Sequence, residues 1–336
     1  MDFPGEKLVI KMWETLAEKP ICALLKPYQM LREGKASIQI KREEVLMLAQ
    51  AEKDAERIRS GELSHYSDPK ITNASSKKTN NVTPVIDMSL LYSYAKDEVV
   101  AKKINEDINV AKAILKAEEV LSNEIADVPK DNIDYDWLYR WSEKASKVSS
   151  DTLQTLWGRV LAGEVKAPGS YSLRTIEFLH SLSQSEARLI EKMMSLVING
   201  KYIFRNDLNK EYDSLDHLDF NEVLELSELG LIYGAEAGGL SFSQDIDVSN
   251  THTLVFRNKR KALTVLNEKM TGRISLSVFQ LTKLGSELIG LAGGQDDEAA
   301  FYNLAQEIKK QGFSVRVWDI NSMVGDHVNL VNGNEI

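Results

Sequence analysis

The stretch LWGRVLAGEVKAPGSYSLRTIEFL, residues 156–179, decides how the middle of the chain folds. Its first half spaces apolar residues along one helical face, and Gly163 follows where a left-handed C-cap would end that helix. Pro168–Gly169 then predicts a tight turn, because these residues favour turn conformations. Ser172 stands where the N-cap of a following helix belongs. We therefore expect a helix–turn–helix corner.

Four polar side chains at this corner allow two interpretations. An arginine–carboxylate clasp between Arg159, Glu164 and Arg174 would fix the angle between the helices. Alternatively, these side chains together with Ser172 would bind a phosphate or carboxylate at a helix N-terminus, where the helix dipole favours an anion. The second interpretation would make the protein an enzyme or a ligand-binding protein.

The region around the corner carries several motifs in a fixed order. Residues 137–187 contain a Trp-Leu pair, then SSDTLQTLWGRVLAGE, PGSYSLRT and LSQSEA. This series resembles the signature of a bacterial family of uncharacterised proteins, known as a domain of unknown function. PYQMLREGKA upstream and LTKLGSELIGL downstream are also similar to that family, so the resemblance extends over nearly the whole chain. It implies no activity, and it suggests a bacterial defence or mobile-element setting.

Composition indicates a soluble globular protein with more than one domain. The chain has 336 residues, of which 43% are hydrophobic and 27% charged. Its net charge of -9 argues against a general affinity for polyanions. The single cysteine, Cys22, fits a reducing compartment, because it cannot form an internal disulfide. With neither an apolar run of membrane-spanning length nor a signal peptide in the sequence, we expect a cytoplasmic protein that does not bind membranes.

The first helix has an apolar face with two interpretations. Residues 6–25 place Leu8, Met12 and Leu16 on one side. This face either packs on its own domain or lies on a membrane or a partner. Attraction to anionic lipid is expected to be weak, because lysines and glutamates balance along the helix (Lys7, Lys11 and Lys19; Glu6, Glu14 and Glu18).

Hydrophobic periodicity predicts a mainly α fold with a smaller α+β part. Helical spacing dominates the first half, whereas alternating strands follow later, and Ser183 with Glu186 forms a capping-box signal between them. The polar end of the chain, VNGNEI, is expected to be frayed. The predicted parts are a helical arm (1–60), a flexible linker (61–84), a helical domain (85–182), a winged-helix-like domain (183–293) and a helix–strand tail (294–336).

The winged-helix-like domain raises the question of DNA binding. Residues 207–228, where a groove-reading helix would lie, carry eight acidic residues and one lysine. Phosphate contacts need positive charge, so this run argues against standard groove reading. A counterweight is the segment FRNKRK, a candidate nucleic-acid contact through a wing that carries Arg257, Lys259, Arg260 and Lys261.

Motifs for catalysis, cofactors and metals are missing from the sequence. The histidines are scattered without metal-ligand spacing, and the phosphate-binding and nucleophile-elbow patterns do not occur. We therefore predict no metal, no cofactor and no catalytic residue. The expected function is a non-catalytic interaction or regulatory protein with a protein partner or self-association. DNA binding and a ligand-binding enzyme at the 159–174 corner remain as alternatives.

Overall fold

The chain folds as two compact units, Met1–Ile176 and Glu177–Ile336. It is mainly α-helical with a smaller β part, as the sequence predicted. The predicted linker 61–84 and Cys22 lie outside the described residues. The computed structural model describes residues 4–17, 38–60, 88–205, 218–235, 239–247, 254–266, 271–291, 298–324 and 327–336.

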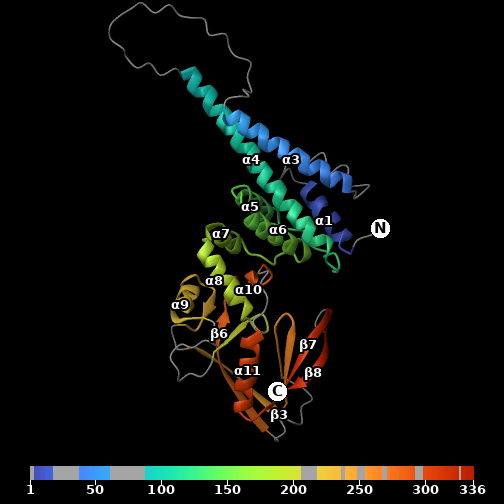
Figure 1. Ribbon diagram of the computed structural model, residues 1–336, viewed down its shortest axis with the longest axis vertical. Coiled ribbons are helices and arrows are strands. Elements are labelled where there is room, and N and C mark those ends of the chain that lie inside the picture. Colours follow the sequence, from blue (N-terminus) through green and yellow to red (C-terminus); the bar gives the residue numbers. More distant parts are fainter. Residues whose placement is uncertain are drawn as a thin grey trace, which may run out of the picture. The chain divides into compact units, whose positions relative to one another are not determined.

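The first unit is built from helices around α4 (Figure 1). α4 is the longest helix of the described residues and contacts α1, α3, α5 and α6. Apolar side chains from these helices form its core, which includes the fully buried Ile114, Trp141 and Trp157. The helices of this unit are α1 (Glu6–Ala17), α3 (Ile38–Arg59), α4 (Met88–Ser122), α5 (Tyr135–Ala145), α6 (Asp151–Lys166) and the start of α7 (Leu173–Ser181).

The apolar face of α1 packs within its own unit. Leu8, Met12 and Leu16 are buried, and α1 contacts α4 and α6. Trp13 Nε1 also donates a hydrogen bond of 3.3 Å to the buried Glu118 of α4. Of the two interpretations of this face, packing on its own domain is therefore the one observed.

The second unit contains α8 (Gln184–Ser195), α9 (Phe220–Glu228), α10 (Lys283–Leu288), α11 (Glu298–Lys310) and two antiparallel sheets. The predicted capping box of α8 is present, because Ser183 and Glu186 exchange hydrogen bonds. In the first sheet, β6 (Thr271–Leu281) pairs with β1 (Tyr202–Arg205), β2 (Ile232–Tyr233) and β3 (Leu240–Asp247). The second sheet has the order β4 (Leu254–Arg257), β5 (Lys261–Leu266), β7 (Ser314–Val324), β8 (His327–Glu335).

Three phenylalanines join the two sheets of the second unit. Phe256 of β4 lies with its ring centroid 5.3 Å from that of Phe204 in β1 and 5.7 Å from that of Phe242 in β3. All three pairs of rings meet edge to face, a geometry favoured by the aromatic quadrupole. The cluster fixes the β4–β5 hairpin against the first sheet.

The prediction of a frayed C-terminal end is wrong. Residues 327–335 form β8, which pairs with β7 through partners such as Asp319 and Val331. Gly333 lets Trp318 lie close, because a Cβ there would stand 2.4 Å from the indole ring. Polar residues suit β8 because, among the described strands, it is the outer one of its sheet.

Candidate functional site

Glu164 closes the corner between α6 and α7. Its side chain is buried, with 1% relative exposure. Oε1 accepts a hydrogen bond of 2.6 Å from the amide of Gly169, and Oε2 accepts one of 3.1 Å from the amide of Tyr171. The predicted Pro168–Gly169 turn is confirmed, because Gly169 has φ of 86° and the Ser170 amide donates to the Ala167 carbonyl at 3.1 Å. One carboxylate thus satisfies two main-chain donors of the turn.

Gly163 has a different structural role from the predicted C-cap. It is not a C-cap, because α6 continues to Lys166 and the Ala167 amide donates to the Gly163 carbonyl. A Cβ at Gly163 would stand 2.6 Å from the Tyr171 ring, so the missing side chain makes room for that ring. Trp137 Nε1 donates to the Tyr171 carbonyl at 2.7 Å. Tyr171 is therefore fixed by its ring, its amide and its carbonyl.

The other candidates at the corner lie around this closed centre. The Ser172 hydroxyl accepts a hydrogen bond of 3.4 Å from the Thr175 amide, as expected at a helix start. Arg159 is half-buried on α6, whereas Arg174 is exposed in the first turn of α7. The arginine clasp and the anion site both stay predictions, and the observed bonds of Glu164 and Ser172 hold the backbone.

The basic segment FRNKRK forms the β4–β5 hairpin in the second sheet. Asn258, which is 8% exposed, accepts main-chain hydrogen bonds from the amides of Arg260 at 3.0 Å and Lys261 at 2.6 Å. The side chains of Lys259 and Arg260 are exposed, and Arg257 at the end of β4 is half-buried. Two of the four predicted basic residues therefore face solvent at the tip of this hairpin.

Lys261 has contacts within its own unit. Its Nζ lies 3.2 Å from Asp319 Oδ1 and 5.7 Å from the centroid of the Tyr302 ring. Burial lowers the pKa of Lys261, but the Asp319 hydrogen bond and the electrostatic interactions with Tyr302, Glu298 and Asp319 outweigh it, so the pKa is raised. The Asn332 and Lys261 hydrogen bonds lower the pKa of Asp319. Both groups therefore carry a charge at neutral pH and stabilise the sheet.

α9 presents carboxylates where a groove-reading helix would need bases. Asp219 and Glu222 form the capping box of this helix, and Lys192 of α8 binds Glu222 at 2.6 Å. Glu225 and Glu228 are exposed. The preceding part of the acidic run, residues 206–217, lies outside the described residues.

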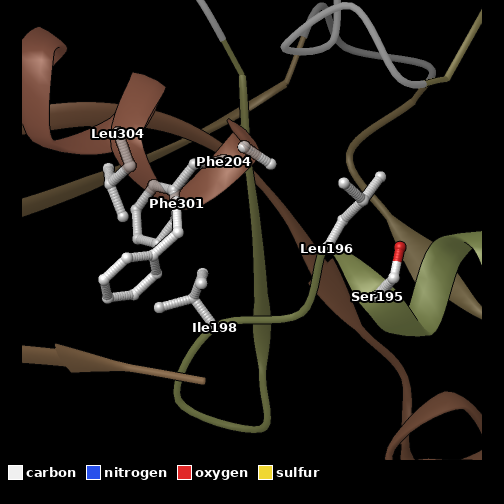
Figure 2. Close-up of a pocket in the computed structure, with 7 residues that line it drawn as sticks. Ser195, Leu196, Ile198, Phe204, Phe301 and Leu304 are labelled. Carbon is white, nitrogen blue, oxygen red and sulfur yellow. The ribbon is translucent and has the colours of Figure 1, made fainter. Parts of the chain in front are cut away.

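An apolar junction in the second unit leaves no room for a ligand. Figure 2 shows Phe301 and Leu304 of α11 facing Ile198, with Phe204 of β1 behind them. The space that a water molecule could enter between these side chains has a volume of about 0 Å³. The junction is therefore packed core.

A second hollow, in the first unit, has room for a ligand. This α1–α5 pocket has a volume of about 180 Å³ and lies between α1 and the segment that leads into α5. Lys11 Nζ donates a hydrogen bond to Asn132 Oδ1 across it, and Thr15 Oγ1 donates to the Lys11 carbonyl at 2.8 Å. The lining residues are Lys11, Glu14, Thr15, Asn132, Ile133, Tyr135 and Leu138.

Exposed apolar and aromatic side chains flank the α1–α5 pocket. Tyr139 is 59% exposed and lies one turn after Tyr135, which lines the pocket and is 46% exposed. Ile10 is 47% exposed and lies one turn before Glu14. The sequence did not predict this site, because its two walls are more than 100 residues apart and the charges of Lys11 and Glu14 looked like a balanced solvated face.

Two negative findings apply to the described parts of the chain. No group of three or more histidine, cysteine, aspartate or glutamate side chains within them could hold a metal ion. No helix among the described residues is both long and apolar enough to cross a membrane.

Comparison with known proteins identifies a family and no activity. Residues 95–305 match the family described as "Protein of unknown function (DUF2806)", and the chain belongs to that family. A family of this kind was expected from the motifs, although the match leaves out α1, α3, β7 and β8. No curated protein and no solved structure matches the chain.

Proposed function

We propose that this family member is a non-catalytic interaction protein that binds a protein partner at the α1–α5 pocket. One observation carries the proposal: a pocket of about 180 Å³ lies beside the exposed Ile10, Tyr135 and Tyr139 in a single compact unit. Exposed tyrosines next to a small pocket are typical of interface hot spots, where an aromatic anchor meets a hollow on the partner.

The size of the pocket supports a protein partner over a cofactor. Small-molecule and cofactor sites commonly occupy roughly 300–1,000 Å³. The α1–α5 pocket, at about 180 Å³, is smaller and has the dimensions of a single large side chain. Its contents would therefore come from a larger molecule that also covers the surrounding surface, including Tyr139.

The test compares capture of a partner by two tyrosine variants. The full chain is used as bait in a bacterial lysate at low and at high salt, with nuclease treatment. Tyr139→Ser removes an exposed ring beside the pocket, whereas Tyr233→Ser removes a ring of similar exposure (57%) in the second unit. We expect Tyr139→Ser alone to lose a stoichiometric, nuclease-resistant partner.

Two results of this capture experiment would change the proposal. Equal capture of the partner by both variants would show that the partner does not bind at the α1–α5 pocket. A captured partner that is a second copy of this chain would replace a foreign partner with self-association, which light scattering of the purified protein would show independently.

The second unit supports a regulatory setting for the proposed interaction. The order α8, β1, α9, β3, β6, with β6 between β1 and β3, is the order expected of a winged-helix-like domain, extended by the second sheet. We propose that this domain serves protein contacts, because the described face of α9 exposes Glu225 and Glu228. The proposed location is the bacterial cytoplasm, in a defence or mobile-element context.

Nucleic-acid binding is the second candidate, favoured by the exposed Lys259 and Arg260 in one hairpin turn. The test is the salt dependence of binding to duplex DNA, for the wild type and for a Lys259→Gln/Arg260→Gln double variant. If this candidate is correct, the double variant lowers the slope of log K against log salt by about two. Binding that is absent in the wild type, or a slope that does not change, would exclude this use of the hairpin.

A further inference from the structure

The α1–α5 pocket has an acceptor group without a partner in the described part of the chain. The Glu14 carboxylate lines the pocket, is exposed, and makes no hydrogen bond or ion pair with another described residue. The other charged group of the wall, Lys11, already donates to Asn132. The Glu14 carboxylate can therefore still accept a hydrogen bond from a ligand. A cationic donor would bind it most strongly.

The charges of the pocket lining allow a cation. The lining holds one carboxylate, that of Glu14, and one ammonium group, that of Lys11. The flanking segment 130–140 carries both signs, with Asp131, Asp134 and Asp136 on the acidic side and Lys130 and Arg140 on the basic side. Because Lys11 already donates to Asn132, the Glu14 carboxylate is the charge that a ligand would meet, and it would repel an acidic ligand.

The remaining walls suit a long side chain with a charged end. Leu138 is buried and Ile133 is half-buried, so the two give the pocket an apolar side. Lysine and arginine place their methylene stems on such surfaces and keep the charged group at a polar rim.

From the free Glu14 carboxylate, the apolar wall and the size of the pocket, we infer that the α1–α5 pocket takes a lysine or arginine side chain of a protein partner. The inference rests on the proposed function and specifies the chemistry of the partner. The cationic end binds Glu14, the stem packs on Ile133 and Leu138, and the rest of the partner covers Tyr139.

Two small probes test this chemistry without knowledge of the partner. N-acetyl-arginine amide presents the cationic side chain, and N-acetyl-citrulline amide presents a neutral side chain of almost the same shape. Binding of each to the full-length protein is measured by titration calorimetry and by saturation-transfer NMR. We expect the arginine probe to bind in the millimolar range and the citrulline probe to bind roughly tenfold more weakly.

A glutamate pair locates the effect. Glu14→Gln keeps the shape of the side chain and removes its charge, so we expect it to weaken arginine binding by roughly tenfold and to leave citrulline binding unchanged. Glu225→Gln, an exposed carboxylate on α9, is the matched control and should change neither. Thermal unfolding of both variants confirms that the fold is retained.

The outcomes separate this inference from the proposed function. Equal binding of the two probes, or no binding of either, would overturn the inference. Capture that still depends on Tyr139 would then leave the interaction proposal standing. Capture that does not depend on Tyr139, with arginine binding that does depend on Glu14, would instead overturn the interaction proposal and leave a small-cation site.

Discussion

Two charged turns, the α6–α7 corner and the β4–β5 hairpin, are closed by the same device and expose their charges differently. At the corner, Glu164 is buried and accepts from two main-chain amides. At the hairpin, the neutral Asn258 accepts from two main-chain amides, and Lys259 and Arg260 point into solvent. Each turn has one buried side chain that accepts from two main-chain amides. Counting the charged residues of the turn would not have identified that side chain.

The difference lies in what surrounds each acceptor. Glu164 is 1% exposed, and both of its oxygens accept from main-chain amides within the packed first unit. Asn258 is also buried, but it lies in a hairpin turn between the exposed side chains of Lys259 and Arg260 and the rest of the sheet. We therefore expect the buried acceptor of the corner to contribute more to stability than the exposed side chains of the hairpin.

Removing Glu164 should give the largest effect. Glu164→Ala leaves the amides of Gly169 and Tyr171 without an acceptor, and we expect the free energy of unfolding to fall by about 3 kcal/mol. Glu164→Gln retains one acceptor oxygen and should lose about half of that. Urea denaturation followed by tryptophan fluorescence measures both, and a loss below about 1 kcal/mol for the alanine variant would show that the turn closes without the carboxylate.

Filling the space under Tyr171 should give the next largest effect. Gly163→Ala places a Cβ against the ring, so we expect a loss of about 2 kcal/mol as the ring is displaced. Gly169→Ala meets no neighbour and costs only its left-handed backbone, about 1 kcal/mol. If the two variants unfold at the same urea concentration, close packing of Tyr171 is not what defines the corner.

Asn258→Ala should cost less than Glu164→Ala, at about 1.5 kcal/mol, because the lost acceptor is a neutral amide oxygen. Lys259→Gln is its control and should change the free energy of unfolding by no more than about 0.5 kcal/mol. Denaturant titrations of both variants give the comparison. A larger loss for Asn258→Ala than for Glu164→Ala would reverse the ranking of the two turns.

The smallest effect concerns pH and the ion pair between Asp319 and Lys261. Because the pKa of Asp319 is lowered on folding, its contribution is present above the ordinary value of 3.8 and is lost as pH falls through the folded value. The raised pKa of Lys261 gives a contribution that is fully present below 10.5 and lost as pH rises through the folded value. Asp319→Asn should therefore lower the free energy of unfolding at neutral pH, and this loss should become smaller in acid. A loss that does not vary with pH would show that the hydrogen bond from Asn332, and not the charge of Asp319, stabilises the sheet.

Local patterns in the sequence predicted most of the helices. The buried face of α1 and the capping box of α8 both follow from spacing within a few residues. The prediction for Gly163 was wrong because a rule for helix ends uses only the local sequence, whereas Gly163 makes room for the ring of Tyr171. β8 was missed because its pairing partner, β7, decides its structure.

The α1–α5 pocket could not be predicted for the same physical reason. Lys11 and Asn132 are 121 residues apart and meet only after α1 has packed on α4. Their local sequence shows an ordinary polar helix face and an ordinary loop. By contrast, the densest motif of the chain forms the corner around Glu164, where the turn signal of Pro168–Gly169 and the cap signal of Ser172 predicted the backbone correctly.

The most direct measurement of the central claim sets two glutamate variants side by side, each assayed for stability and for partner capture. We expect Glu164→Gln to lower the free energy of unfolding and to leave the amount of partner captured per folded molecule unchanged. Glu14→Gln should leave the free energy of unfolding within about 0.5 kcal/mol of wild type and reduce capture. If Glu164→Gln abolished capture while still folded, and Glu14→Gln had no effect, the corner would be the binding site and the account would be contradicted.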